Sequence, residues 1–163
     1  MRNTLLSPMA QAVRLAPLLL LASPFAVALT VVDGTRDIDN TTLLDSYRLN
    51  ANARLNAAGA SMREVNVGAG AQLNMQASTI EAVRADGIAL VSGASASVAG
   101  NSRVVSDRFG LRLQRSDTAG SSALVSDSYV EGGTAGALVS AASSLSLQRS
   151  SLVAVSYTHL TLP

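Results

Sequence analysis

The chain has 163 residues, of which 48% are hydrophobic, 3% aromatic and 14% charged, and its formal net charge is +1 at pH 7. The absence of cysteine excludes disulfide bonds, thiolate metal sites and a cysteine nucleophile. Because the apolar fraction is high and the charged fraction low, a disordered acidic or basic tail is also excluded.

The N-terminal segment, residues 1–28, has the layout of a secretory signal peptide. Arg2 and Arg14 give a positive start, and the apolar run of residues 15–27 leads to small residues that suit signal peptidase. We predict cleavage after Ala28. Two prolines interrupt the run, which is shorter than the ~20 residues of a membrane-spanning helix. The mature part then keeps 10 arginines against 11 acidic residues, so we expect no nucleic-acid partner.

Residues 29–154 carry a repeat. A serine followed two positions on by an apolar β-branched residue marks three units, and Ser151-Leu152-Val153 marks a fourth. Glycines recur at matching intervals, each followed by an apolar run. The serines are Ser78, Ser102, Ser128 and Ser151, spaced 24, 26 and 23, and the glycines are Gly87, Gly110 and Gly136, spaced 23 and 26.

A second signature, Leu-x-apolar-Gln-x-Ser, begins at Leu73, Leu111 and Leu145. Its alternation of apolar and other residues is the pattern of a strand with one buried face. Earlier in the chain, the sequence Ala-Arg-Leu-Asn from Ala53 recurs as Ala-Gln-Leu-Asn from Ala71, at a somewhat shorter interval.

Short strands at a period near 23, with no helical stretch between them, predict an all-β fold. We expect a right-handed parallel β-helix of about five coils of 18–26 residues, preceded by the signal peptide. One ambiguity of register remains, because the segment from Ser102 to Asp107 also matches the segment from Ser122 to Asp127 at a spacing of 20. That alternative would stack Asp107 on Asp127 in neighbouring coils.

The C-terminal segment, residues 155–163, differs in pattern from the rest. Its sequence VSYTHLTLP resembles the translation of a sequencing-library adapter end. We therefore predict that this segment is non-native and that the natural chain continues beyond Ala154; the alternative is an ordinary β-rich tail. On this interpretation the only histidine, His159, is not native. The last coil would then be open, with interior side chains left uncovered at Leu145, Leu147, Leu152 and Val153.

A signal peptide followed by cysteine-free coils of this type resembles the passenger region of a bacterial autotransporter of the pertactin-like group. The coil from Ser78-Thr79-Ile80 through Gly87-Ile88-Ala89-Leu90 to Gly93-Ala94-Ser95-Ala96 carries the resemblance. It implies an N-terminal passenger fragment with a structural or adhesive role, exported through the periplasm to the outer-membrane surface of a Gram-negative cell, or secreted. The partners it implies are a C-terminal outer-membrane barrel, missing from this sequence, and ligands on host or neighbouring cells. The Arg-Gly-Asp adhesion tripeptide of some members is absent, and Arg84-Ala85-Asp86-Gly87 only approaches it.

We expect no enzymatic activity, no catalytic residue, no cofactor and no metal. A Ser-His-Asp triad would depend on His159. The alternative is a secreted β-helix polysaccharide hydrolase or lyase fragment that uses stacked aspartates from the set Asp107, Asp117 and Asp127. Aspartate after serine more often caps a turn, which is the role that we expect here.

Two further charged groups have a structural interpretation. Asp33, Asp37 and Asp39 resemble a calcium loop, but Ile38 and Leu44 stand where the glycine and the bidentate acid belong. We therefore expect a polar turn before the first coil. A second group, for which we expect a solvated face of mixed charge because aspartates are interleaved, consists of Arg103, Arg108, Arg112 and Arg115.

Overall fold

The computed structural model describes residues 28–115 and 119–155. The predicted signal peptide except Ala28, the predicted tail except Val155, and Asp117 and His159 lie outside the described residues. Within these ranges the chain forms sixteen strands and no helix. The strands are β1 (Leu29–Val32), β2 (Thr35–Asp39), β3 (Asp45–Leu49), β4 (Arg54–Ala58), β5 (Ser61–Val67), β6 (Gln72–Gln76), β7 (Thr79–Ala82), β8 (Ile88–Leu90), β9 (Ser95–Ala99), β10 (Arg103–Ser106), β11 (Phe109–Leu113), β12 (Ser122–Ser126), β13 (Tyr129–Gly132), β14 (Ala135–Val139), β15 (Ser144–Gln148) and β16 (Ser151–Ala154).

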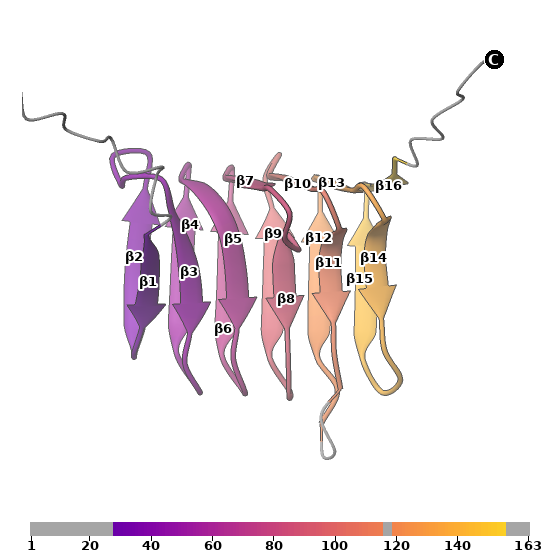
Figure 1. Cartoon of the computed structure of the whole chain (residues 1–163), viewed down its shortest axis with the longest axis horizontal. Coiled ribbons are helices and arrows are strands. Elements are labelled where there is room, and N and C mark those ends of the chain that lie inside the picture. Colours follow the sequence, from indigo (N-terminus) through magenta and orange to yellow (C-terminus); the bar gives the residue numbers. More distant parts are fainter. Residues whose placement is uncertain (1–27, 116–118, 156–163) are drawn as a thin grey trace, which may run out of the picture.

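These strands form a β-solenoid of about five turns, which confirms the predicted parallel architecture. Every strand pairing is parallel, and the coils stack side by side along the long axis of the molecule (Figure 1). One sheet of six strands has the order β15-β12-β9-β6-β4-β2, and a ten-stranded sheet makes up the rest. Paired residues are 17 to 27 positions apart, a slightly wider range than expected, with the longest interval between β9 and β12.

The interior consists of columns of apolar side chains that run from coil to coil. Many strands bury alternate residues, as in β6, where Leu73 and Met75 are buried and their neighbours exposed, whereas β8 buries all three of its residues. The burial of apolar surface stabilises a stack of coils, none of which could bury its own inner face alone. One inner column of the six-stranded sheet comprises Leu55, Leu73, Ala96 and Ala123, and a column of the other sheet comprises Ile80, Val104 and Val130.

The register of the repeat agrees with most of the predicted alignment. Gly87, Gly110 and Gly136 are equivalent, since the residues that follow them pair in order across β8, β11 and β14. The fourth serine is different. Because Tyr129 pairs with Ser151, the partner of Ser128 is Ser150, and the predicted alignment of Ser151 was wrong by one residue. The last interval of the repeat is therefore one position shorter than expected.

The second signature mixes two faces of the solenoid. Leu73 and Leu145 lie in one inner column of the six-stranded sheet. Leu111, by contrast, belongs to β11 in the other sheet, where it pairs with Ile88 and Ala137. An alternating pattern determines which side chains are buried, but the same pattern suits every face of a solenoid.

A ladder of buried serines closes the corner that follows the six-stranded sheet. The Oγ of Ser102 accepts a hydrogen bond from the backbone N–H of Ser78 at 3.1 Å and donates to the carbonyl of Ala99 at 2.6 Å. Ser128 repeats this arrangement one coil later, accepting from the N–H of Ser102 at 3.2 Å. The serine of the repeat thus satisfies backbone groups that turn away from the strand ladder.

We predict that Ser102→Ala destabilises the fold by about 1–3 kcal/mol, because it leaves a buried backbone N–H and a carbonyl without their partner. Ser102 is 1% exposed. The matched control is Ser97→Ala in β9, whose hydroxyl lies on the outer face and should cost less than about 0.5 kcal/mol. Urea unfolding followed by circular dichroism measures both, and equal losses for the two variants would contradict the role of the ladder.

The two ends of the described solenoid differ. In β2, Arg36 occupies an inner column, paired with Leu55, and its guanidinium lies 5.9 Å from the centre of the Tyr47 ring, so a charged side chain covers this end. At the other end Leu147 is 43% and Leu152 38% exposed, as expected for an open coil, while Leu145 is half-buried. The prediction that Val153 is an interior residue was wrong, because it pairs with Glu131 in an outward column. No strand of the described ranges pairs with the outer edges of β14, β15 or β16.

Candidate functional site

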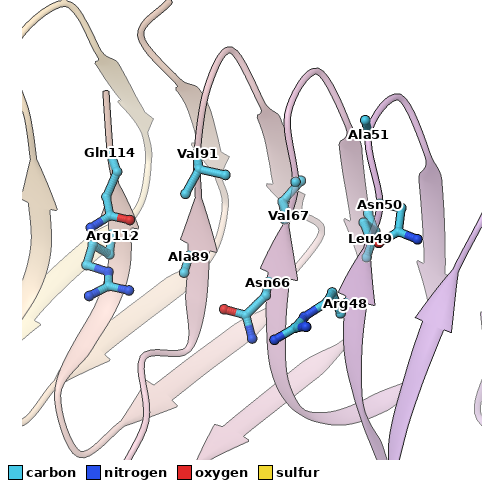
Figure 2. Close-up of a pocket in the computed structure, with 11 residues that line it drawn as sticks. Arg48, Leu49, Asn50, Ala51, Asn66, Val67, Ala89, Val91, Arg112 and Gln114 are labelled. Carbon is cyan, nitrogen blue, oxygen red and sulfur yellow. The ribbon is translucent and has the colours of Figure 1, made fainter. Parts of the chain in front are cut away.

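A groove of about 290 Å³ crosses the outer face of four adjacent strands, β3, β5, β8 and β11 (Figure 2). Longer side chains rise on either side of a floor made of backbone and small residues. The groove is lined by Arg48, Leu49, Asn50, Ala51, Asn66, Val67, Gly68, Ala89, Val91, Arg112 and Gln114.

The strand register forms the groove from one outward column. Arg48 pairs with Asn66, which pairs with Ala89, which pairs with Arg112. All four residues stand between inward-facing neighbours, so the alternation of each strand turns them outward. Ala89 is nevertheless buried at 5% exposure and forms part of the floor. Ala89 has the one short side chain of this column, and the surface is therefore hollow between two arginines (Figure 2).

The lining is cationic. It contains two arginines and three amide side chains, those of Asn50, Asn66 and Gln114, and no carboxylate. Guanidinium groups present paired donors that match carboxylate, sulfate or phosphate oxygens. The arrangement can therefore hold an anion and supply hydrogen bonds to neutral oxygens beside it.

Asp86 holds one of the two arginines in position. Its side chain is 6% exposed, and its Oδ2 lies 2.9 Å from the Nε of Arg112. The Nε of Arg108 lies 3.8 Å from the other oxygen of Asp86. The terminal nitrogens of Arg112 donate no side-chain hydrogen bond to the residues that the structure describes, so they remain for a ligand.

Arg48 has no such partner. Within residues 28–115 and 119–155 no carboxylate oxygen lies within 4.0 Å of its guanidinium. The side chain of Asn66 likewise makes no hydrogen bond to a described residue. In Figure 2 the two side chains lie next to each other at one end of the groove. Both are therefore free to bind a ligand.

A second polar groove, of about 360 Å³, lies at the corner that precedes β10 and β13. Its charged side chains pair with other side chains of the protein. The guanidinium of Arg149 donates two hydrogen bonds to Asp127, at 2.6 and 2.7 Å, and these lower the pKa of the carboxyl. Tyr129 donates to Glu131 at 2.7 Å, which raises the pKa of the phenol, and Arg103 stacks 4.7 Å from its ring centre.

The structure does not bring Asp107 and Asp127 together. Asp107 follows β10 and accepts the backbone N–H of Arg84 at 2.8 Å. Asp127 follows β12 and bonds through its backbone to Asn101 and Gln148 in the adjacent coils. The alternative register at a spacing of 20 was wrong, because β10 pairs with β13 and β12 with β9. The long connection before β12 lengthens this coil and separates the two similar segments.

The three N-terminal aspartates also act separately. Asp33 accepts from Asn50 at 2.6 Å and Asp37 from Asn56 at 2.7 Å. Asp39 accepts hydrogen bonds from the hydroxyl and the backbone N–H of Thr41, and these lower its pKa. The prediction of a polar turn before the first coil was wrong in part. Residues Thr35–Asp39 form β2, which pairs with β4, and only Asp39 caps a turn.

Three of the four arginines in the predicted mixed-charge face pair with acidic side chains from outside the arginine-rich segment of the sequence. Arg103 lies 3.7 Å from Glu131, and Arg108 and Arg112 share Asp86. Arg115 is exposed. Asp86, the acidic residue of the segment Arg84-Ala85-Asp86-Gly87, is buried and paired with arginines. Its carboxylate is therefore not displayed on the surface.

Comparisons with protein-family models, curated proteins and solved structures found no match to this chain. No helix long and apolar enough to cross a membrane occurs in residues 28–115 and 119–155. The same residues contain no group of three or more acidic or histidine side chains placed to hold a metal ion.

Sequence reasoning missed the groove. Arg48 was not singled out, and Arg112 was considered only with the arginines near it in sequence. The signal was present in the intervals that separate Arg48, Asn66, Ala89 and Arg112 along the chain. These match the intervals of the repeat, so an alignment of the coils would have placed the four residues in one column.

Proposed function

We propose that this chain is the N-terminal part of a surface-exposed or secreted passenger, that its role is structural and adhesive and not enzymatic, and that the groove is its adhesive surface. The observation that carries the proposal is the column from Arg48 to Arg112. Two guanidinium groups and an amide face outward across four paired strands, and no carboxylate lines the space between them. Parallel ladders hold the strands in place, so the site needs little ordering when it binds.

The signal-like N-terminus and the coil pattern support an exported protein of the autotransporter type. In this proposal the solenoid is right-handed, the hand that parallel crossover connections take in nearly all proteins. The chain passes through the periplasm, and a C-terminal outer-membrane barrel outside this sequence carries it to the cell surface. N-terminal sequencing of the chain exported by a Gram-negative host should give Leu29 as the first residue, and any other start contradicts cleavage after Ala28.

The adhesive role is tested with beads coated with the chain and washed over a cell monolayer. We expect more beads to be retained than with an albumin coat, and Arg48→Gln to lower the retained number. Arg54→Gln is the matched control, because Arg54 lies on the six-stranded sheet, away from the groove. Retention equal to that of albumin-coated beads would overturn the adhesive role, and equal retention with both variants would overturn the assignment to the groove.

A further inference from the structure

We infer that the groove binds an oligosaccharide that carries carboxylate or sulfate groups and lies along the axis of the solenoid, with anionic groups at Arg48 and Arg112. This inference rests on the proposed function, because it names what the adhesive surface recognises. It is carried by the spacing of the two arginines, the chemistry of the side chains between them and the pairing of the strands beneath.

The spacing of the arginines favours an oligomer over a small anion. Arg48 and Arg112 are three strand steps apart in one column, so their Cα atoms are separated by about 14 Å at 4.7–4.9 Å a step. One carboxylate or sulfate group could bind both guanidinium groups only if both side chains leaned toward the middle of the column, and Asp86 holds Arg112 in place. A chain with an anionic group at each end of the span can, and it would run from coil to coil.

Groups that suit neutral oxygens lie between the two charges. Asn66 lies between the arginines in the column, and Gln114 lies beside Arg112, two residues further along the chain; both amides line the groove (Figure 2). Ala89 leaves the space that a sugar ring would fill. Sugar hydroxyl groups both donate and accept, so they can pair with these amides while the arginines bind the charged groups.

The strands beneath disfavour an extended peptide. β5 and β8 are interior strands of the sheet, paired on both sides, as β5 is with β3 and β8. A peptide that binds to a sheet obtains its affinity from a free strand edge, and none exists here. A peptide in this groove would give up the hydration of its backbone amides without replacing those hydrogen bonds.

The column also limits the length of the charged site. Beyond Arg48 the next outward residue is Val31, 49% exposed, and beyond Arg112 it is Leu138, 43% exposed. Both ends therefore change from cationic to apolar side chains. A ligand with two anionic groups at this separation fits the column, and a denser polyanion gains no further arginine in it.

The test is calorimetric titration of the chain with five probes. They are a heparin-derived hexasaccharide, a galacturonate hexasaccharide, neutral maltohexaose, a hexaglutamate peptide and inorganic sulfate. We expect at least one of the two acidic sugars to bind, with affinity that falls as salt is added, and the other three to bind at least tenfold more weakly. Arg48→Gln should weaken sugar binding about tenfold or more, because it removes a charge-assisted contact, and Arg54→Gln should leave it unchanged.

Three results would overturn the inference. Equal binding of hexaglutamate would mean that the groove recognises charge alone, and equal binding of sulfate would mean a single-anion subsite. Absence of binding by both acidic sugars would exclude the ligand class. Arg48 is exposed and pairs with no described carboxylate, so we expect Arg48→Gln to fold; an unchanged circular dichroism spectrum checks this. Amide NMR shifts at both Asn66 and Gln114 would show that one ligand spans the groove.

The two proposals fail in different ways. If acidic sugars bind but coated beads are retained no better than albumin, the adhesive role fails and the site stands. If beads adhere in an Arg48-dependent manner but neither sugar binds, the adhesive groove stands and its assignment to acidic oligosaccharides is overturned.

Discussion

Replacing Gly110 by alanine should cost more than about 4 kcal/mol of unfolding free energy. A Cβ at this position would lie 2.7 Å from the carbonyl oxygen of Gly136 and 2.9 Å from that of Glu131. It would also lie 2.5 Å from Cγ1 of Val130. Two of these atoms are backbone of the next coil, so the clash is relieved only if the coils separate.

The control for this substitution is Gly34→Ala. Nothing lies within 4 Å of a Cβ built at Gly34, but its φ of +84° is strained for alanine. We expect a loss of about 1–2 kcal/mol there, which isolates the backbone cost from the clash. Urea unfolding of both variants gives the comparison, and a loss at Gly110 no larger than that at Gly34 would show that the coils are less closely packed than the structure indicates.

Leu73→Ala should cost about 2–5 kcal/mol of unfolding free energy. The side chain is fully buried in the inner column of the six-stranded sheet, between Leu55 and Ala96. Ala96 is too short to fill the space that the substitution would leave. Because the paired strands hold the column at a constant spacing, we expect the cavity to persist, which places the loss in the upper part of that range.

Leu124→Ala is the matched control for this prediction. Leu124 lies on the same sheet, but it is directed outward and is 37% exposed, so its removal should cost under about 1 kcal/mol. Thermal or urea unfolding distinguishes the two variants. Similar losses at both positions would contradict the assignment of inner and outer faces in this sheet.

The groove and the core residue Leu73 lie in different sheets of the solenoid. Leu73 lies in the six-stranded sheet, whereas Arg48 and Arg112 belong to strands of the other sheet. A solenoid places functional residues by stacking, so each of the four strands beneath the groove belongs to a different coil. The binding site consequently depends on the register between coils more than on any single loop.

The sequence by itself determines the strands, the repeat and the parallel architecture. Alternating apolar residues mark the buried faces, and glycine, serine and asparagine end the strands, since they tolerate the conformations of tight corners. The equivalence of Gly87, Gly110 and Gly136 was readable because each glycine precedes an apolar run at a similar interval. The uncovered apolar residues at the last described coil also follow from the repeat, as the exposure of Leu147 confirms.

Only the tertiary structure decided how far each coil is offset from the next. Paired residues lie 17 to 27 positions apart, and the length of each corner sets that number. Local alternation is compatible with many offsets, which explains the error of one residue at Ser151 and why the alternative register that stacks Asp107 on Asp127 stayed open in the sequence. The column from Arg48 to Arg112 was missed for the same reason, because it appears only when four coils are aligned with one another. Residues distant in sequence become neighbours only when every intervening coil closes, and closure depends on the packing of the whole interior.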